Sequence, residues 1–486
     1  FKHALVQDTA YSTMLVKQRR RLHERIAKTL QESSPAAAGT EPEIIAHHLT
    51  SAGLNEQAVE YWDRAARRAA AQSANIEAVD HFRTAIELLS KLPENARRRR
   101  AELHLQLGLG PALMAVHGWG NQDVAETYDR ARTLGAEERD IPSLFQATWG
   151  LWLFYQSRSA HRQARQLTSE LMEYASGAAD TALDLQAHHA TWTTNLFTGE
   201  VATAIQHCEA GLRLYDKSRH RNHALQYGGH DPCVCGHVQG AVMHWLFGQA
   251  EQAERHNQKG LALAEELEHR TSLVHAHLFS TRYRMMRNEP LKALGHAEQM
   301  IIHGKDMGLQ LYTTVGEAWR GWAMVRTGDL DAGLGHIKGL IAEMNAGRAR
   351  LPAPLDLAFF ADALAANEEY DAALLQLADA LKLIQRTGER FWEPEIHRLQ
   401  GEFLWRNGSS TIEEIKERFV VAIEESQSIA AKALELRAAS SLARLMFENG
   451  DTSGARRFLE PVYNWFSEGH DTPDMKNAKK LLEAMA

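Results

Sequence analysis

A short pattern that recurs about every forty residues constrains the fold of this 486-residue chain more than any other feature. A Gly or Asn is followed five residues later by a residue that is usually small, as in Gly199/Ala204 and Gly450/Ala455. The second member falls at positions 125, 164, 204, 253, 293, 333, 372, 415 and 455, of which 164 and 415 fit in weaker form because Ser159 and Ser410 precede them. Gly and Asn tolerate the left-handed conformation that ends a helix, and a small residue lets the next helix pack closely. The spacing predicts an array of helix hairpins.

Composition narrows the class of protein further. The chain is 44% hydrophobic and 24% charged and has only 12 prolines, which favours many uninterrupted helices over disorder. Its formal charge of −8 gives no electrostatic reason to expect a nucleic-acid partner. No apolar run is long enough to span a membrane, and three cysteines cannot build a disulfide framework. We therefore expect a cytoplasmic protein that binds neither nucleic acid nor membrane.

The spacing inside the repeats resembles the tetratricopeptide pattern, in which a small residue is followed by a bulky one four later and a small one seven later. Two sets fit it directly, Ala58/Trp62/Ala65 and Ala78/Phe82/Ala85, and a third set keeps it one residue past position 372, Ala373/Leu377/Ala380. We expect an all-α fold, a right-handed α-solenoid of tetratricopeptide-like helix hairpins. Each repeat has about 40 residues, whereas the usual tetratricopeptide unit has about 34.

Interruptions of the pattern divide the chain into three expected segments. Residues 1–92 would hold N-terminal helices and the first tetratricopeptide-like repeats, and Pro93 would break the pattern at a joint. Residues 93–468 would form the main solenoid. The helix expected within 469–486 would cap the stack, because a terminal repeat needs one polar outer face.

The N-terminal segment starts at Phe1 within a helical pattern and without an initiator Met, so we expect the chain to be the C-terminal part of a longer protein. Its basic stretch reads as an amphipathic helix with Leu15, Leu22, Ile26 and Leu30 facing inward. We expect this helix to form the junction with an upstream module.

The segment His230–His244 is the one place where metal-binding residue types gather. A zinc site would recruit His230, Cys233, Cys235 and His237, since thiolate and imidazole are preferred zinc ligands. The C-x-C spacing lacks the two separated CxxC arms of a structural zinc site, and no HExxH motif is present. We therefore predict no metal, while the sequence leaves open whether Cys233 and Cys235 bind one.

A bend between helices accounts for the same segment. Gly228 and Gly229 would end one helix, Asp231 would be the N-cap of the next, and Pro232 would occupy its first position. His230 would then point toward the inner face of the solenoid.

Four stretches carry a resemblance to a known family: FKHALVQDTAYSTMLVKQRRRLHERIA, YGGHDPCV, GERFWEPEIHRLQGEFLW and PVYNWFSEGHDTPDMKNAKKLL. They resemble the C-terminal tetratricopeptide-like region of bacterial signalling proteins that place a class III adenylate/guanylate cyclase domain, or a kinase domain, ahead of an AAA-type ATPase. The similarity runs over most of the chain. The family usually has Gly where this chain has Cys233, which weakens the case for a metal ligand there.

The inner surface of a solenoid is made by the first helix of each hairpin, and this surface recognises partners. Tetratricopeptide offsets, together with the histidine segment, place ten residues on or near it: Gln146, Trp149, Gln186, His189, His230, Asp231, His275, Arg282, Trp322 and Arg326. Aromatic and Arg side chains are frequent anchors in binding grooves. We expect a protein or peptide ligand there.

The sequence contains no phosphate-binding loop and no catalytic triad motif, so we expect no catalytic residues and no cofactor in this segment. The resemblance implies a regulatory, signal-sensing solenoid whose other partners are the upstream ATPase and cyclase modules of the same chain. Two alternatives stay open. One is the inducer-binding solenoid of a transcription regulator, and the other is a metal-dependent enzyme that uses His230–His244.

Overall fold

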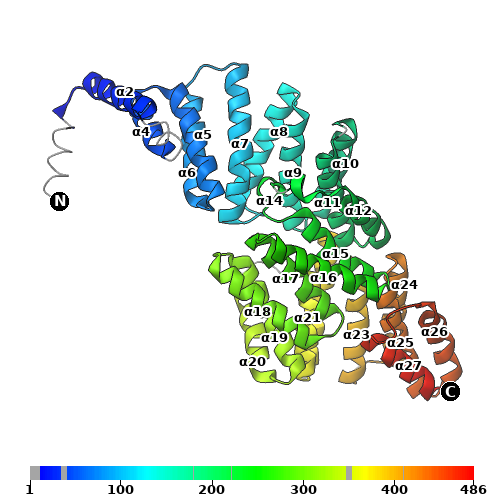
Figure 1. Ribbon diagram of the computed structural model, residues 1–486. Helices are drawn as coiled ribbons and strands as arrows, with labels where there is room; N and C mark the ends of the chain where they lie inside the picture. The colour runs from blue at the N-terminus through cyan, green and yellow to red at the C-terminus, as the bar shows by residue number, and fades with distance from the viewer. Residues whose placement is uncertain are drawn as a thin grey trace. The chain divides into compact units, whose positions relative to one another are not determined.

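The computed structural model describes residues 11–486 apart from 12, 34–40, 179, 221, 346–352 and 409. Every regular element in the described ranges is helical, and the helices follow one another as hairpins (Figure 1). The start of the first resemblance stretch and the Gly- and Pro-rich loop after Asn345 lie largely outside these ranges. None of the described helices combines the length and the apolarity that crossing a membrane requires.

The chain divides into two compact units, of which the first comprises residues up to Phe154 with Gln226–Gly228 and the second the remaining residues. The first unit contains α2 (Val16–Ser33), α4 (Pro42–Ala52), α5 (Asn55–Ala71), α6 (Asn75–Ser90), α7 (Ala96–His117), α8 (Gln122–Glu138) and most of α9 (Ile141–Ser157).

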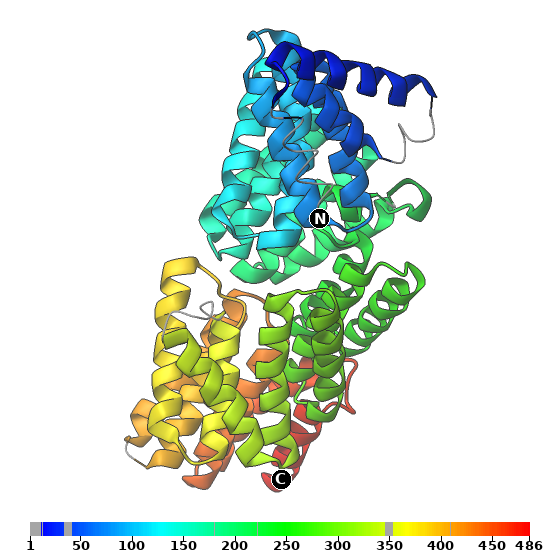
Figure 2. The same cartoon turned by 90° about the vertical axis from the view of Figure 1, so that its left-hand side faces the viewer.

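The second unit opens with α10 (His161–Ala178), α11 (Thr181–Thr198), α12 (Val201–Leu214), α13 (Lys217–His220), α14 (His223–Gln226), α15 (Pro232–Leu246), α16 (Ala250–Glu266), α17 (Arg270–Met286) and α18 (Pro290–Asp306). It continues with α19 (Gln310–Thr327), α20 (Leu330–Asn345), α21 (Pro354–Ala366), α22 (Tyr370–Thr387), α23 (Glu393–Asn407), α24 (Ile412–Ser428), α25 (Lys432–Glu448), α26 (Thr452–Trp465) and α27 (Pro473–Ala484). Within the second unit, the two helices of a hairpin lie side by side in both views, as α15 with α16 and α18 with α19 show (Figures 1 and 2).

The forty-residue pattern marks the second helix of each hairpin. The fourth residue of α12 is Ala204 and that of α16 is Ala253, and neither exposes any surface. In α22 the buried fourth residue is Ala373, so the expected position 372 is off by one. The predicted all-α solenoid of helix hairpins is confirmed.

One hairpin shows how close the helices approach at this position. A Cβ on Gly333 of α20 would lie 2.6 Å from the carbonyl oxygen of Gly321 and 2.8 Å from the backbone nitrogen of Val325, both on α19. No real side chain tolerates such distances, and backbone atoms cannot turn aside as a side chain does. By contrast, a Cβ on Gly335 would meet no atom within 4 Å.

We expect Gly333→Ala to lower the free energy of unfolding by about 1–3 kcal/mol, because the added methyl group forces α19 and α20 apart. Gly335→Ala, two residues along the same helix, should be neutral or stabilising by up to about 1 kcal/mol, since Ala favours the helix and meets nothing. Urea unfolding of both variants checks this. Equal stabilities would contradict the close contact.

The interval between α12 and α15 holds the extra residues of the longest repeat. They form the two single-turn helices α13 and α14 and a turn in which Gly228 and Gly229 have φ of +75° and +83°. Asp231 is the N-cap of α15, since its side chain accepts hydrogen bonds from the backbone nitrogens of Cys233 and Val234. The predicted bend is confirmed, including Pro232 at the first helical position.

Within the second unit, early repeats contact late ones. The backbone nitrogen of Arg390 donates to the carbonyl oxygen of Phe197 at 2.9 Å. Nearby, His161 Nε2 lies 3.5 Å from Glu389 Oε2, and both side chains are 2% exposed. The array of this unit therefore curves until the end of α11 and the start of α10 meet the segment before α23, and the first helices of its hairpins surround a covered interior.

Two details at the ends of the chain refine the expectations. In α2, Leu15 precedes the helix and is 70% exposed and Leu22 is 39% exposed, whereas the buried residues are His23 and Ala27. The predicted inward face was thus wrong in part. At the other end, Met485 is buried against the hydrophobic core of the last hairpin.

The joint expected at Pro93 is a loop between α6 and α7. These two helices pack against each other inside the first unit, and the division between the units falls near Tyr155 instead.

Candidate functional site

The ten residues predicted for the inner surface lie on the first helices of successive hairpins or on the loop before one of them. Gln146 and Trp149 belong to α9 in the first unit, and the others to the second unit. Eight of the ten are buried: Trp149, Gln186, His189, His230, Asp231, His275, Arg282 and Trp322. Gln146 is half-buried and Arg326 is exposed. Most of the surface that the tetratricopeptide offsets identify is therefore buried inside the second unit.

Imidazoles cluster at one end of this interior. Gln186 of α11 donates from Nε2 toward His223 Nδ1 at 2.9 Å, and its Oε1 lies 3.1 Å from His189 Nδ1. The ring of His230 contacts His189 edge to face and stacks on His275, with ring centres 4.0 Å apart. Burial holds the pKa of His189 and His275 well below the usual 6.5. These side chains are therefore neutral imidazoles.

Arg282 of α17 occupies the next part of the interior. Its guanidinium lies 5.2 Å from the ring centre of Phe279, 5.5 Å from that of Trp319 and 5.7 Å from that of Phe197. The side chain is only 9% exposed, and among the described residues no carboxylate lies within ion-pair distance and no acceptor takes a hydrogen bond from it. Burial lowers the pKa of Arg282 from 12.5. A cation caged by aromatic faces without a direct counter-ion is costly to bury.

Two carboxylates, Asp356 and Glu389, act on Arg282 electrostatically from beyond ion-pair distance and partly offset the effect of burial on its pKa. Asp356 accepts a hydrogen bond from Trp319 Nε1 at 2.9 Å and one from the backbone nitrogen of Ala353 at 3.0 Å. Glu389 uses Oε2 near His161, while its buried Oε1 has no hydrogen-bond partner. The interior therefore holds a cation that lacks a direct acceptor and a carboxylate oxygen that lacks a donor.

The residues that the offsets missed form a buried ion-pair network further along the array. Arg398 of α23 pairs with Glu395 at 2.8 Å, and Glu402 accepts from Ser441 Oγ at 2.6 Å and from Arg444. Burial raises the pKa of Glu395, but the two guanidiniums beside it outweigh that effect and lower it. The sequence indicates this network in the stretch EPEIHRLQGEF, where charged residues recur at helical spacing between apolar ones.

A histidine pair repeats on three hairpins and was also missed. One ring comes from the first helix and the other from the second, 19 residues later, with Nδ1 to Nδ1 distances of 2.8, 3.2 and 3.2 Å. The pairs are His188/His207, His237/His256 and His277/His296. Burial lowers the pKa of His237 to about 4 and that of His256 to about 3. The equal spacing of nineteen could have been found in the sequence.

These pairs predict that acid destabilises the second unit. An unfolded histidine binds a proton below about pH 6.5, whereas folded His256 and His277, with pKa values of about 3, do not. The unfolded state therefore gains protons first, and stability falls as the pH drops from about 6.5 toward 4, by up to about 1.4 kcal/mol per pH unit for each such histidine.

Urea unfolding measured between pH 7.5 and pH 4.5 checks this expectation. His256→Gln should reduce the slope of the unfolding free energy against pH by up to about 1.4 kcal/mol per pH unit, which corresponds to one proton. This holds whatever the substitution does to stability at pH 7.5. Its partner His237 and the neighbouring His244 and Lys259 face His256, so they shape the curve but do not change its sign. A slope that is the same in the variant would contradict the assignment.

Comparisons with known proteins agree with the class that this geometry defines, a tetratricopeptide-like helical-repeat protein. No family model matches the chain. An uncharacterized protein of Rhizobium meliloti (strain 1021) is 26% identical over 448 residues, which are 92% of this chain and 43% of that protein. The chain thus spans less than half the length of this curated relative.

Among solved structures, a Rap protein complexed with Competence and Sporulation Factor aligns over 81% of this chain and 100% of its own, with a TM-score of 0.52 and 12% identity. A signal transduction ATPase with numerous domains and a tetratricopeptide repeat sensor, from Pyrococcus horikoshii, aligns over 83% of this chain and 67% of its own, with a TM-score of 0.38 and 11% identity. The likeness to the Rap protein shows that the fold is shared.

Proposed function

We propose that this segment is a non-catalytic regulatory solenoid that binds a protein or peptide on the first helices of its hairpins. The observation that carries the proposal is Arg282, a buried guanidinium between three aromatic rings with no carboxylate within ion-pair distance among the described residues. An acidic side chain or a chain-terminal carboxylate of the ligand would supply the missing counter-ion.

The surroundings favour a peptide over a simple anion. The unpartnered Oε1 of Glu389 would accept a hydrogen bond from a ligand N–H, and the aromatic walls suit an extended chain with apolar groups. The Rap protein of similar fold was solved with a bound factor, which supports the same use of the fold.

Access to Arg282 requires the second unit to open. Phe197 forms one wall of the cage and also accepts the backbone hydrogen bond from Arg390. Separation of this contact would uncover the guanidinium, so binding and opening would be coupled. This coupling would give the solenoid the two states that a sensor needs.

The wider context rests on the family resemblance. A chain that spans 43% of its relative leaves room for further modules in that protein. We propose that the solenoid regulates an upstream cyclase and ATPase, whose nucleotide chemistry lies outside these residues.

Arg282 gives the first prediction for binding. Selection from a displayed random-peptide library should enrich sequences with Asp, Glu or a free terminal carboxylate, and Arg282→Gln should weaken the selected peptides by about 2–5 kcal/mol. Arg326→Gln is the matched control, because Arg326 lies on α19, the first helix of the next hairpin, and its guanidinium already contacts Asn288. Peptides that bind both variants as they bind the wild type would exclude Arg282 as the anchor.

The regulatory context has its own experiment. Cyclic-nucleotide production by the full-length parent protein should change when the chain is truncated just before Phe1, provided that the catalytic domain still folds. An increase identifies the solenoid as a brake and a decrease as an activator. An unchanged rate would mean that the solenoid acts only as a scaffold. Absence of product from both proteins would favour the alternative, the inducer-binding solenoid of a transcription regulator.

A further inference from the structure

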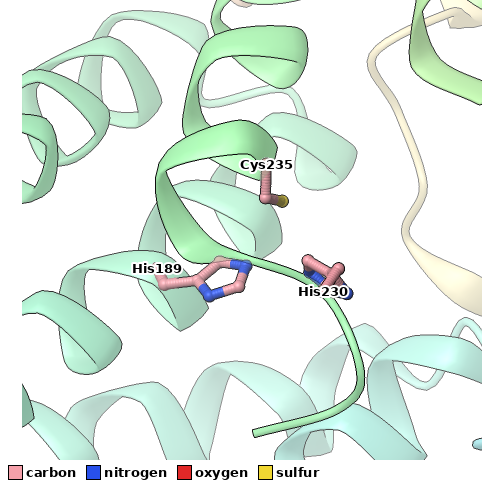
Figure 3. A group of neighbouring side chains, drawn as sticks. All are labelled: His189, His230 and Cys235. Carbon is pink, nitrogen blue, oxygen red and sulfur yellow. The ribbon is translucent and has the colours of Figure 1, made fainter. Parts of the chain in front are cut away.

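Three side chains of the second unit, from two helices and the loop between α14 and α15, meet at the start of α15. His189 comes from α11, His230 from the loop before α15 and Cys235 from the first turns of α15. One ligand atom from each lies within 4.8 Å of the others, and all three residues are buried. Figure 3 shows the two imidazoles on either side below the Cys235 side chain.

The geometry points to a metal site: we propose that His189, His230 and Cys235 bind a divalent ion of the zinc class. Imidazole nitrogen and thiolate sulfur are the ligands that zinc prefers, and three protein ligands with one open position are a common zinc arrangement. The set differs from the one considered from the sequence. His237 pairs with His256 instead, and Cys233 is not part of the group.

The cap of α15 explains why His230 and Cys235 meet although five positions separate them. With Asp231 as N-cap, His230 is the residue before the cap and Cys235 the fourth residue of the helix. Side chains at these two positions normally pack on each other and fix how the chain enters a helix. Apolar pairs are usual there, whereas this chain has an imidazole and a thiol.

Gln186 fixes the tautomer of His189 that can bind a metal ion. Its Oε1 lies 3.1 Å from His189 Nδ1, so it accepts the Nδ1 proton and leaves Nε2 with its lone pair. A hydrogen bond with His223 orients the Gln186 amide in turn. This is how proteins commonly fix the tautomer of a metal-binding histidine.

His275 packs against the proposed site. Its ring lies parallel to that of His230 with centres 4.0 Å apart, it is 4% exposed, and neither ring nitrogen has a hydrogen-bond partner among the described residues. Buried nitrogens without partners are unfavourable. His275 is not one of the residues whose ligand atoms come together, and its ring stacks on the face of His230, so it would line the site without binding the ion.

Protonation in the absence of metal is consistent with this chemistry. Burial holds the pKa of Cys235 well above 9.0 and that of His189 well below 6.5, so a thiol and a neutral imidazole face each other. Coordination would replace the thiol proton with the ion, and one proton would leave to solvent for each ion bound. The ion would join α11 to the start of α15 across the longest repeat.

Cobalt provides the test, because Co²⁺ takes zinc sites and a cobalt–thiolate bond absorbs in the near ultraviolet. The whole chain, purified with a histidine-free tag, should bind one Co²⁺ with a thiolate band and release of one proton. Zn²⁺ should then displace the Co²⁺ without further proton release. Cys235→Ser should lose the band. The matched control is Cys233→Ser, which removes a buried thiol two residues earlier in the same helix and should keep it.

Gln186→Ala adds a second variant that leaves all three ligands in place. Its expected effect is a 10- to 100-fold weaker zinc affinity with the band retained, as for other residues that orient a ligand. A wild-type chain without the thiolate band, or a band lost in Cys233→Ser but kept in Cys235→Ser, would overturn the proposal. The cobalt measurement needs no peptide ligand, so its result does not depend on whether Arg282 binds a peptide.

Discussion

Close contact between two helices, at a residue that has almost no side chain in most repeats, is the constraint on which the hairpins depend. In α24 the buried Ile415 stands at this position instead. Ala204 and Ala253 occupy this position in neighbouring repeats and are fully buried, and Gly333 occupies it where even a methyl group would collide with backbone. Repetition of the contact at nearly constant spacing stacks the first helices side by side. The faces that line the interior are a consequence of this stacking.

The interior of the second unit is more polar than a hydrophobic core of this size requires. Neutral imidazoles, the caged Arg282 and the partly unpartnered Glu389 are all buried there, although each is costly to remove from water. Stability alone does not explain such residues, since apolar side chains of similar size would pack as well. The proposed binding surface rests on these buried polar groups, and the backbone hydrogen bond from Arg390 to Phe197 lies beside them.

The sequence predicted the repeats well because helix ends and small residues have local causes. It placed most second helices to the residue and predicted the cap at Asp231, which depends on neighbouring positions only. It could not predict that His189 and Arg282 would be covered, because helix offsets identify a face of a helix and not the curvature of the array. The exposure of Leu22 could not be predicted for a similar reason, because the apolar pattern of a helix does not tell which neighbouring helix, if any, will cover a given residue.

The longest repeat connects these features. Its extra residues form α13, α14 and the Gly228–Gly229 turn, and this detour brings His230 to the residue before the cap of α15. The irregular repeat thus places metal-binding groups on the same interior face as Arg282, where an ion at His189 and His230 would stiffen one wall of the proposed peptide site. Binding of the ion and binding of the ligand would then act on the same helices, because α11 carries His189 near its middle and Phe197 near its end.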